Sequence, residues 1–179
     1  MGPIITSNQQ IALHSRTIEE VAADLRELLY FLKLQKESTE RRAEQSFIDT
    51  IHHILGELGK KFSFIGRNYR FNISGNDHYI DLLLYHNTSR AFVVILLNPG
   101  AFDPGDLGAL NFRLAVIDDI LRSQHDNKTI GILLCKSKSD VIVEMTLNGF
   151  SSLMCVASYD ANIPNISIQK SISIPKYTK

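Results

Sequence analysis

The sequence predicts an α/β fold in which a mixed β-sheet is flanked by helices. First, helical periodicity before residue 59 gives way to a run of strand-like segments, then to a helix and further strands. Second, Ala91–Leu97 is entirely apolar and is followed by Asn98-Pro99-Gly100, as expected for a strand buried on both faces. Third, 44% apolar and 21% charged residues in 179 are typical of one globular domain with a real core.

The first predicted helix begins after an N-terminal stretch, residues 1–16, that has no clear period. Thr17 and Glu20 fit a capping box, in which each side chain satisfies a backbone N–H of the other residue's turn. Apolar residues then recur at helical spacing at Ile18, Val21, Leu25, Leu28, Leu29 and Leu32. This amphipathic helix is expected to pack on the domain or on a second chain.

A second helix is predicted over Thr39–Leu58, and Gly59 stands where a left-handed C-cap is common. Its apolar face consists of Phe47, Ile48, Ile51, Ile54, Leu55 and Leu58. His52 and His53 are adjacent on this helix, so their side chains point about 100° apart and do not chelate one ion together.

Strands come next in the chain. Three are predicted over Phe62–Ile65, Tyr69–Ile73 and His78–Tyr85, and the "SGND" segment before the third supplies the residues of a hairpin turn. Ala91–Leu97 is the fourth strand. A site is expected where strand ends of such a sheet splay apart.

The remaining elements follow the same reasoning. A helix is predicted over residues 105–124, with Leu110, Leu114, Ile117 and Leu121 on its inner side. Strands are predicted over residues 129–135 and 153–159, and residues 141–147 favour a short helix over a strand. The tail after residue 160 alternates Ile with polar residues, which predicts an edge strand or a disordered end.

Composition narrows the function classes. Lys+Arg and Asp+Glu are balanced at 19 each, so nucleic acid would be bound only through a local basic patch. No apolar run approaches the ~20 residues of a membrane span, and the first ten residues lack the features of a signal peptide. Cys135 and Cys155 lie in apolar stretches and are expected to be buried thiols, so a cytoplasmic location is predicted.

Several phrases, in order, resemble one known family. "GELGKKFSFIGR", "YIDLLLYH", "FVVILLNPGAFDPGDLGALNFRLAVIDDIL" and "TIGILLCKSK" are similar to the YhcG-like family of PD-(D/E)XK nucleases, over about residues 44–160. The resemblance implies a restriction-endonuclease-like core of order αβββαβ. In that core an aspartate and a Glu-x-Lys triplet bind a divalent metal ion and activate water.

The resemblance also implies a domain organisation. The segment "LYFLKLQKESTERRAEQ" resembles the tail of that family's separate N-terminal domain. Residues 1–38 are therefore interpreted as a tail and amphipathic helix left from an upstream domain, residues 39–160 as the nuclease-like domain, and residues 161–179 as a C-terminal tail.

The family's catalytic motif is degenerate in this sequence. Asp81 matches the aspartate, but the acidic residue of the triplet falls on Leu96, the middle residue on Leu97 and the lysine on Asn98. A leucine side chain cannot ligate a cation, and a neutral carboxamide lacks the charge that stabilises the transition state. The resemblance thus implies a pseudonuclease, with no cofactor expected and Mg²⁺ needed only if residual activity exists.

Positions around the motif have changed as well. Glu44 matches the family's upstream helical glutamate, whereas Ala109 after Gly108 stands where the family usually has glutamine. Arg113 stands where the family often has tyrosine, and Asn68 replaces the glutamine that follows the Gly-Arg pair.

Two readings of the remaining acids stay open. Asp81 is either a weak metal ligand or, as favoured here, a carboxylate hydrogen-bonded to a neighbouring backbone group or to Asn98. Asp103 and Asp106 either face Asp81 in a migrated site or, as favoured here, are the turn and N-terminal acids that a helix prefers.

Basic residues suggest a partner. Tyr69 and Tyr79 could add base stacking to a phosphate-binding strip, and the alternative is scattered solvated charges. The candidate nucleic-acid-binding residues are Arg67, Arg70, Arg113, Lys136 and Lys138.

Three functions remain in view. The first is DNA or RNA binding without cleavage by a degenerate nuclease domain. The second is a protein-interaction or homodimerisation module that uses the Ile18–Leu32 helix. The third is an active metal-dependent DNA endonuclease with a rearranged site. No membrane partner is expected.

Overall fold

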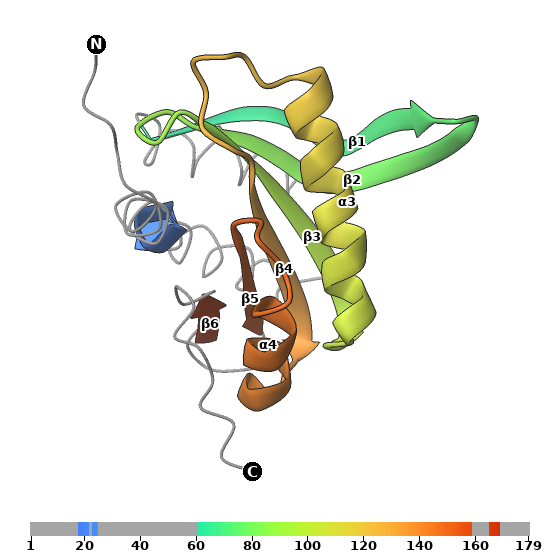
Figure 1. The fold of residues 1–179 in the computed structure, drawn as a ribbon, viewed down its shortest axis with the longest axis vertical. Coiled ribbons are helices and arrows are strands. Elements are labelled where there is room, and N and C mark those ends of the chain that lie inside the picture. The colour runs from blue at the N-terminus through green and yellow to red at the C-terminus, as the bar shows by residue number, and fades with distance from the viewer. Residues whose placement is uncertain (1–17, 22, 25–60, 159–164, 169–179) are drawn as a thin grey trace, which may run out of the picture.

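The computed structural model describes residues 18–21, 23–24, 61–158 and 165–168 (Figure 1). The predicted helix over Thr39–Leu58, with Glu44, and the capping residue Thr17 lie outside the described residues. Residues 18–21 and 23–24 are helical, in agreement with the predicted first helix. None of the helices within the described ranges is long and apolar enough to cross a membrane.

The described chain forms one six-stranded mixed sheet, which confirms the predicted fold class. Its strands lie in sequence order: β1 (Phe62–Ile73), β2 (Asn76–His86), β3 (Ala91–Ala101), β4 (Ile130–Ser137), β5 (Met154–Ser158) and β6 (Asn165–Ile168). The first three strands pair antiparallel, β3–β4 and β4–β5 pair parallel, and β6 pairs antiparallel at the edge. Helix α3 (Pro104–Ile120) connects β3 to β4, and α4 (Asp140–Leu147) connects β4 to β5.

The β1–β2 hairpin differs from the prediction in its first strand. The two short strands predicted before residue 73 are one strand, β1, whose register shifts between Phe64 and Gly66 and which passes through Asn68 with φ of 47°. The predicted hairpin turn is confirmed at Ser74 and Gly75, where φ is 52° and 83°. Positive φ at both positions of a two-residue loop matches the twist of the flanking strands.

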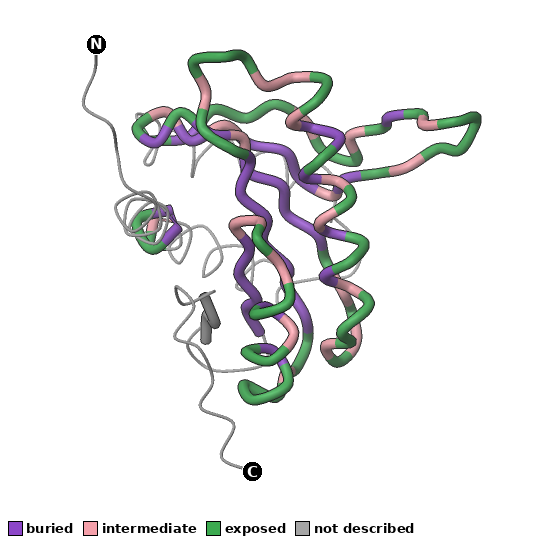
Figure 2. Tube along the Cα trace, in the orientation of Figure 1, coloured by how far each residue is buried: buried purple, intermediate pink, exposed green. Residues whose placement is uncertain are grey.

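Apolar side chains form a core on each face of the sheet because successive strand residues alternate between faces. Val93 and Ile95 of β3 belong to one cluster with Ile18 and Val21, so the described part of the first helix packs on the chain's own sheet. The other cluster lies between the sheet and helices α3 and α4. Figure 2 shows the buried positions along the central strands and on α3.

Helix α3 begins with a capping box. Asp103 accepts a hydrogen bond from the backbone of Gly105, Asp106 reaches back to the backbone N–H of Asp103, and Pro104 takes the first helical position. The helix ends at Ile120 and not at residue 124 as predicted. The chain turns there because Ser123 donates its backbone N–H and hydroxyl to the Asp126 carboxylate.

Asp126 also links this turn to the sheet, and the link depends on pH. The Tyr85 hydroxyl donates to Asp126 Oδ1 at 2.7 Å, and this bond, with those from Ser123, lowers the pKa of Asp126 to about 2. Because the folded pKa is depressed, this stabilisation is complete above the ordinary aspartate pKa of about 3.9 and is lost as the pH falls towards 2.

We expect Asp126→Asn to lower the free energy of unfolding at pH 7 and to flatten its decline between pH 4 and 2, since the variant lacks the titrating group. Urea unfolding at a series of pH values measures this. Asp119→Asn, on the exposed side of α3, is the matched control and should keep the wild-type pH profile. An unchanged profile for Asp126→Asn would contradict the assignment.

Candidate functional site

The candidate site lies at a fork where β2 and β3 separate. The β2–β3 ladder ends at the pair Leu82 and Ile95, whereas β3 continues against β4 as far as Asn98 and, after an irregularity, Ala101. Asp81 is therefore the first β2 residue beyond the ladder. This is the splayed strand arrangement at which a site was expected.

Asp81 is partly buried at the fork, and its carboxylate is engaged by the backbone. Leu97 donates its N–H to Asp81 Oδ2 at 2.8 Å, across the gap that the ladder leaves open. The favoured interpretation of Asp81 included a hydrogen bond to a neighbouring backbone group, and the structure contains that bond. The contact joins β2 to β3 where backbone pairing has stopped.

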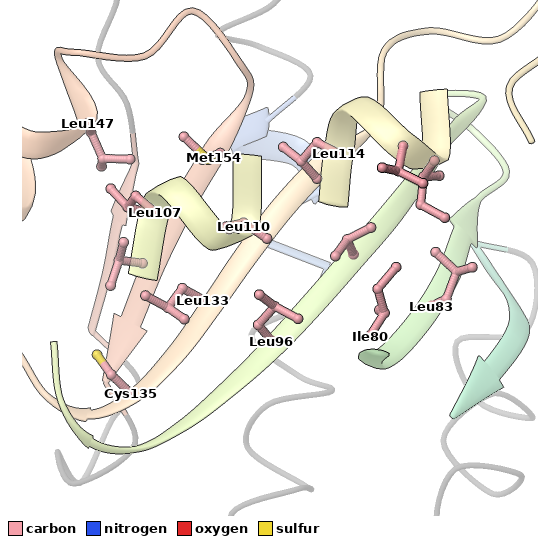
Figure 3. Packing of buried hydrophobic residues seen from close by; sticks show 14 of the residues in the cluster. Ile80, Leu83, Leu96, Leu107, Leu110, Leu114, Leu133, Cys135, Leu147 and Met154 are labelled. Carbon is pink, nitrogen blue, oxygen red and sulfur yellow. The ribbon is translucent and has the colours of Figure 1, made fainter. Parts of the chain in front are cut away.

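Leu96, at the acidic position of the motif, belongs to the hydrophobic core. Its side chain is 9% exposed and lies in the cluster beneath α3. Figure 3 shows it between Ile80 and Leu133, under the helix that carries Leu110. The neighbouring Leu97 is 53% exposed, so adjacent residues of β3 have opposite environments.

Asn98, at the lysine position, holds the turn between β3 and α3. Its Nδ2 donates to Asp106 Oδ2 at 2.7 Å and to the Ala101 carbonyl at 3.2 Å, and its Oδ1 accepts from the Gly100 N–H at 2.8 Å. The amide thus uses both donor hydrogens and its acceptor within the turn. This role was not predicted from the sequence.

Asp103 and Asp106 are both committed to the N-terminal cap of α3. Asp106 Oδ2 accepts from Asn98 and also from the backbone N–H of Asp103 at 3.0 Å. These contacts are those of the helix-cap interpretation. Throughout the part of the chain that the structure describes, no three or more His, Cys, Asp and Glu side chains are grouped to hold a metal ion.

Arg113 reaches from α3 to the fork. Its Nε donates to the Tyr79 carbonyl at 2.7 Å, two residues before Asp81 in β2, and its terminal nitrogen donates to the Ala109 carbonyl at 2.9 Å. Partial burial lowers the pKa of the Arg113 guanidinium, and the negative charge of Asp81 opposes this shift. The positive charge of Arg113 therefore lies near Asp81. In the sequence, this position was marked only by the resemblance, because Arg113 stands where the family often has tyrosine.

The donor atoms at the fork do not fit a divalent metal ion. Such an ion needs hard oxygen ligands close together, and the two other motif positions offer a buried leucine and an amide held in a turn. The retained carboxylate of Asp81 is hydrogen-bonded to Leu97 and shares the fork with the Arg113 cation.

The candidate nucleic-acid-binding residues are spread over two ends and two faces of the sheet. Arg70 forms an ion pair with Asp77 at 2.6 Å in the β1–β2 hairpin, where Arg67 is also exposed. Lys136 is exposed at the end of β4, whereas the Lys138 side chain is 2% exposed and forms an ion pair with Asp140.

Strand alternation separates Arg70 from Arg113. Tyr69 and Phe71 pack against the core cluster beneath α3, so Arg70, which lies between them, points to the opposite face of the hairpin. Tyr79 is opposite Arg70 in the β1–β2 register and is 50% exposed. The hairpin therefore presents Arg70 and Tyr79 together, away from the side on which Arg113 bonds to β2.

Comparisons with known proteins show which family this chain is similar to. The family model described as the YhcG PDDEXK nuclease domain matches residues 21–173. A curated Escherichia coli (strain K12) protein named "Putative nuclease YhcG" is 29% identical over 138 residues, which are 77% of this chain and 37% of that protein. The chain thus spans well under half of this relative. A crystal structure of a repair endonuclease from Pyrococcus abyssi matches with a TM-score of 0.35 and 13% identity, over 57% of this chain and 41% of that one.

Proposed function

The chain belongs to the YhcG PDDEXK nuclease domain family, and from this premise we propose that it is a catalytically degenerate member that binds nucleic acid without cleaving it. Degeneracy is supported by the structural roles of the two residues at the acidic and lysine positions of the motif. Leu96 packs in the core beneath α3, and the Asn98 amide is fully hydrogen-bonded in the β3–α3 turn.

The chemistry of phosphodiester cleavage explains why these two positions matter. A metal ion held by carboxylates neutralises charge on the phosphate and acidifies a bound water, and a lysine stabilises the charged transition state. Removing one such contact commonly costs roughly 10²-fold or more in rate. The loss of the acid and the lysine together therefore leaves a scaffold whose surface can still bind a nucleic acid.

The β1–β2 hairpin is the best candidate for the binding surface. It is a two-stranded ribbon that extends beyond the rest of the sheet (Figure 1), and ribbons of this kind fit the major groove of a duplex. Arg67 and Arg70 supply positive charge, and the half-exposed Tyr79 ring supplies a stacking surface. Arg70 would exchange its Asp77 partner for a phosphate oxygen. Lys136 adds a separate contact at the end of β4.

Fluorescence anisotropy with labelled duplex DNA, single-stranded DNA and RNA tests the proposed binding. We expect the affinity to fall roughly tenfold between about 50 and about 200 mM salt, because two contacted phosphates release about two counterions. Arg67→Ala/Arg70→Ala should remove most of the binding and most of the salt dependence.

The matched control is Arg90→Gln/Lys128→Gln, which removes the same charge at two exposed residues outside the hairpin while glutamine can still donate hydrogen bonds. An equal loss of affinity in this control would show that net charge and not the hairpin determines binding. Absence of binding by the wild-type protein at the lowest salt would refute the nucleic-acid part of the proposal.

The alternative function, protein interaction or homodimerisation through the Ile18–Leu32 helix, has less support. Ile18 and Val21 are 1% and 0% exposed within the core cluster of the chain's own sheet, so this part of the apolar stripe is already covered. We also propose a cytoplasmic location, since Cys135 and Cys155 are free, buried thiols, which suits a reducing compartment.

A further inference from the structure

A positive charge is built into the fork beside the retained acid. Arg113 extends from the middle of α3 and donates to the Tyr79 carbonyl at 2.7 Å. Tyr79 and Asp81 are two residues apart in β2, a separation of about 7 Å along a strand. The second bond, to Ala109 at 2.9 Å within the same helix, fixes the guanidinium in this position.

The net charge at the fork differs from the concentrated negative charge that a metal site requires. A site for a dication concentrates negative charge, with at least two carboxylate or carbonyl oxygens directed at one point. Here Asp81 contributes one negative charge, and Arg113 places a permanent positive charge within range of it. A second cation entering the fork would be repelled by the guanidinium and would share the Asp81 carboxylate with the Leu97 N–H.

We infer that Arg113 is a resident cation beside Asp81 at the β2–β3 fork, and that its charge opposes the binding of a divalent metal ion there. The inference deepens the proposed function, on which it rests. It adds a third change to the two motif substitutions. Restoring the acid and the lysine alone would then leave the fork unfavourable to metal, because the arginine would remain.

A purely structural role for Arg113 makes a different prediction. In that case its two bonds to backbone carbonyls join α3 to β2, and the charge is incidental. Lysine keeps the charge but cannot reproduce the planar arrangement of guanidinium donors, whereas glutamine can donate a hydrogen bond without charge. The two substitutions therefore separate the effect of charge from that of joining the elements.

The experiment measures Mn²⁺ affinity by isothermal titration for the wild-type protein and for Arg113→Gln, Arg113→Lys and Arg113→Glu. We expect Arg113→Gln to bind Mn²⁺ roughly tenfold more tightly than wild type, because one unit of repulsion is removed. Arg113→Glu should bind more tightly still, since it replaces a positive charge near Asp81 by a negative one. Arg113→Lys should bind no more tightly than wild type.

Two further variants locate the effect. Asp81→Asn combined with Arg113→Glu should return Mn²⁺ binding to the wild-type level, and Arg122→Glu, just beyond the end of α3, should leave it unchanged. The inference is overturned if Arg113→Gln gains nothing, if Arg113→Lys gains as much, or if Asp81→Asn has no effect. Circular dichroism reports folding, and the Gln–Lys comparison stands even if Arg113→Glu does not fold. Nuclease activity of the wild type would refute the proposed function while leaving these affinities to decide the inference.

Discussion

Leu96→Glu is expected to lower the free energy of unfolding by roughly 2–4 kcal/mol, because it places a carboxylate among apolar side chains without a partner. Leu96 is 9% exposed and packs with Ile80, Leu110 and Leu133 beneath α3 (Figure 3). The substitution restores the acidic residue of the family motif, so it measures how far this position has changed from ligand to core. Urea unfolding at neutral pH gives the value.

Leu97→Glu is the matched control for this prediction. It is the same substitution one residue later on the same strand, at a side chain that is 53% exposed, and it should change stability by no more than about 0.5 kcal/mol. If Leu96→Glu were tolerated as well as Leu97→Glu, the Leu96 position would have room for a solvated acid. The acidic position of the motif would then not have become part of the core.

The elements that the sequence predicted well are those with strong local signals. The apolar run of β3, the helical spacing of α3 and the turn residues of the β1–β2 hairpin each specify their structure within a short window. The short helix α4, favoured over a strand, is also present. The edge-strand expectation for the tail is met by β6, which pairs with β5.

The differences arise where distant residues decide the structure. Strand β3 runs to Ala101, four residues past the predicted end, because Ala101 pairs with Ser137 of β4. Strand β1 is continuous because pairing with β2 extends across Asn68, a residue type that accepts positive φ more readily than most. The local pattern of apolar and polar residues predicts neither of these pairings.

The sequence named candidate site residues but gave no account of their contacts. The resemblance identified Asp81, Leu96 and Asn98, and the structure brings all three to the fork and its adjoining turn. The hydrogen bond from Leu97 to Asp81 spans strands that no longer pair, and the bonds of Asn98 depend on how α3 begins. Such contacts need the three-dimensional arrangement.

The contacts of Arg113 could not be predicted from the sequence either. In the sequence it was one of several basic residues considered for nucleic-acid binding, and its bond to the Tyr79 carbonyl joins segments 34 residues apart. Strand alternation then separates it from Arg70, which points to the other face of the hairpin. The sequence left open one phosphate-binding strip or scattered charges, and the structure places Arg113 at the fork and Arg70 on the hairpin surface.

The largest expected effect concerns hydrolysis itself. With the acid and the lysine of the motif replaced, the rate should be lower than that of an intact site by roughly 10⁴-fold or more, since each lost contact costs about 10²-fold. The third function considered, that of an active endonuclease with a rearranged site, requires instead that other groups bind the metal beside Asp81.

Cleavage of labelled DNA and RNA in Mg²⁺ or Mn²⁺, measured for the wild-type protein beside Asp81→Ala, distinguishes these outcomes. Degeneracy predicts that both proteins remain at the background rate of the substrate alone, while an unrelated metal-dependent nuclease cuts the same substrates. Metal-dependent cleavage by the wild-type protein that disappears in Asp81→Ala would contradict the account.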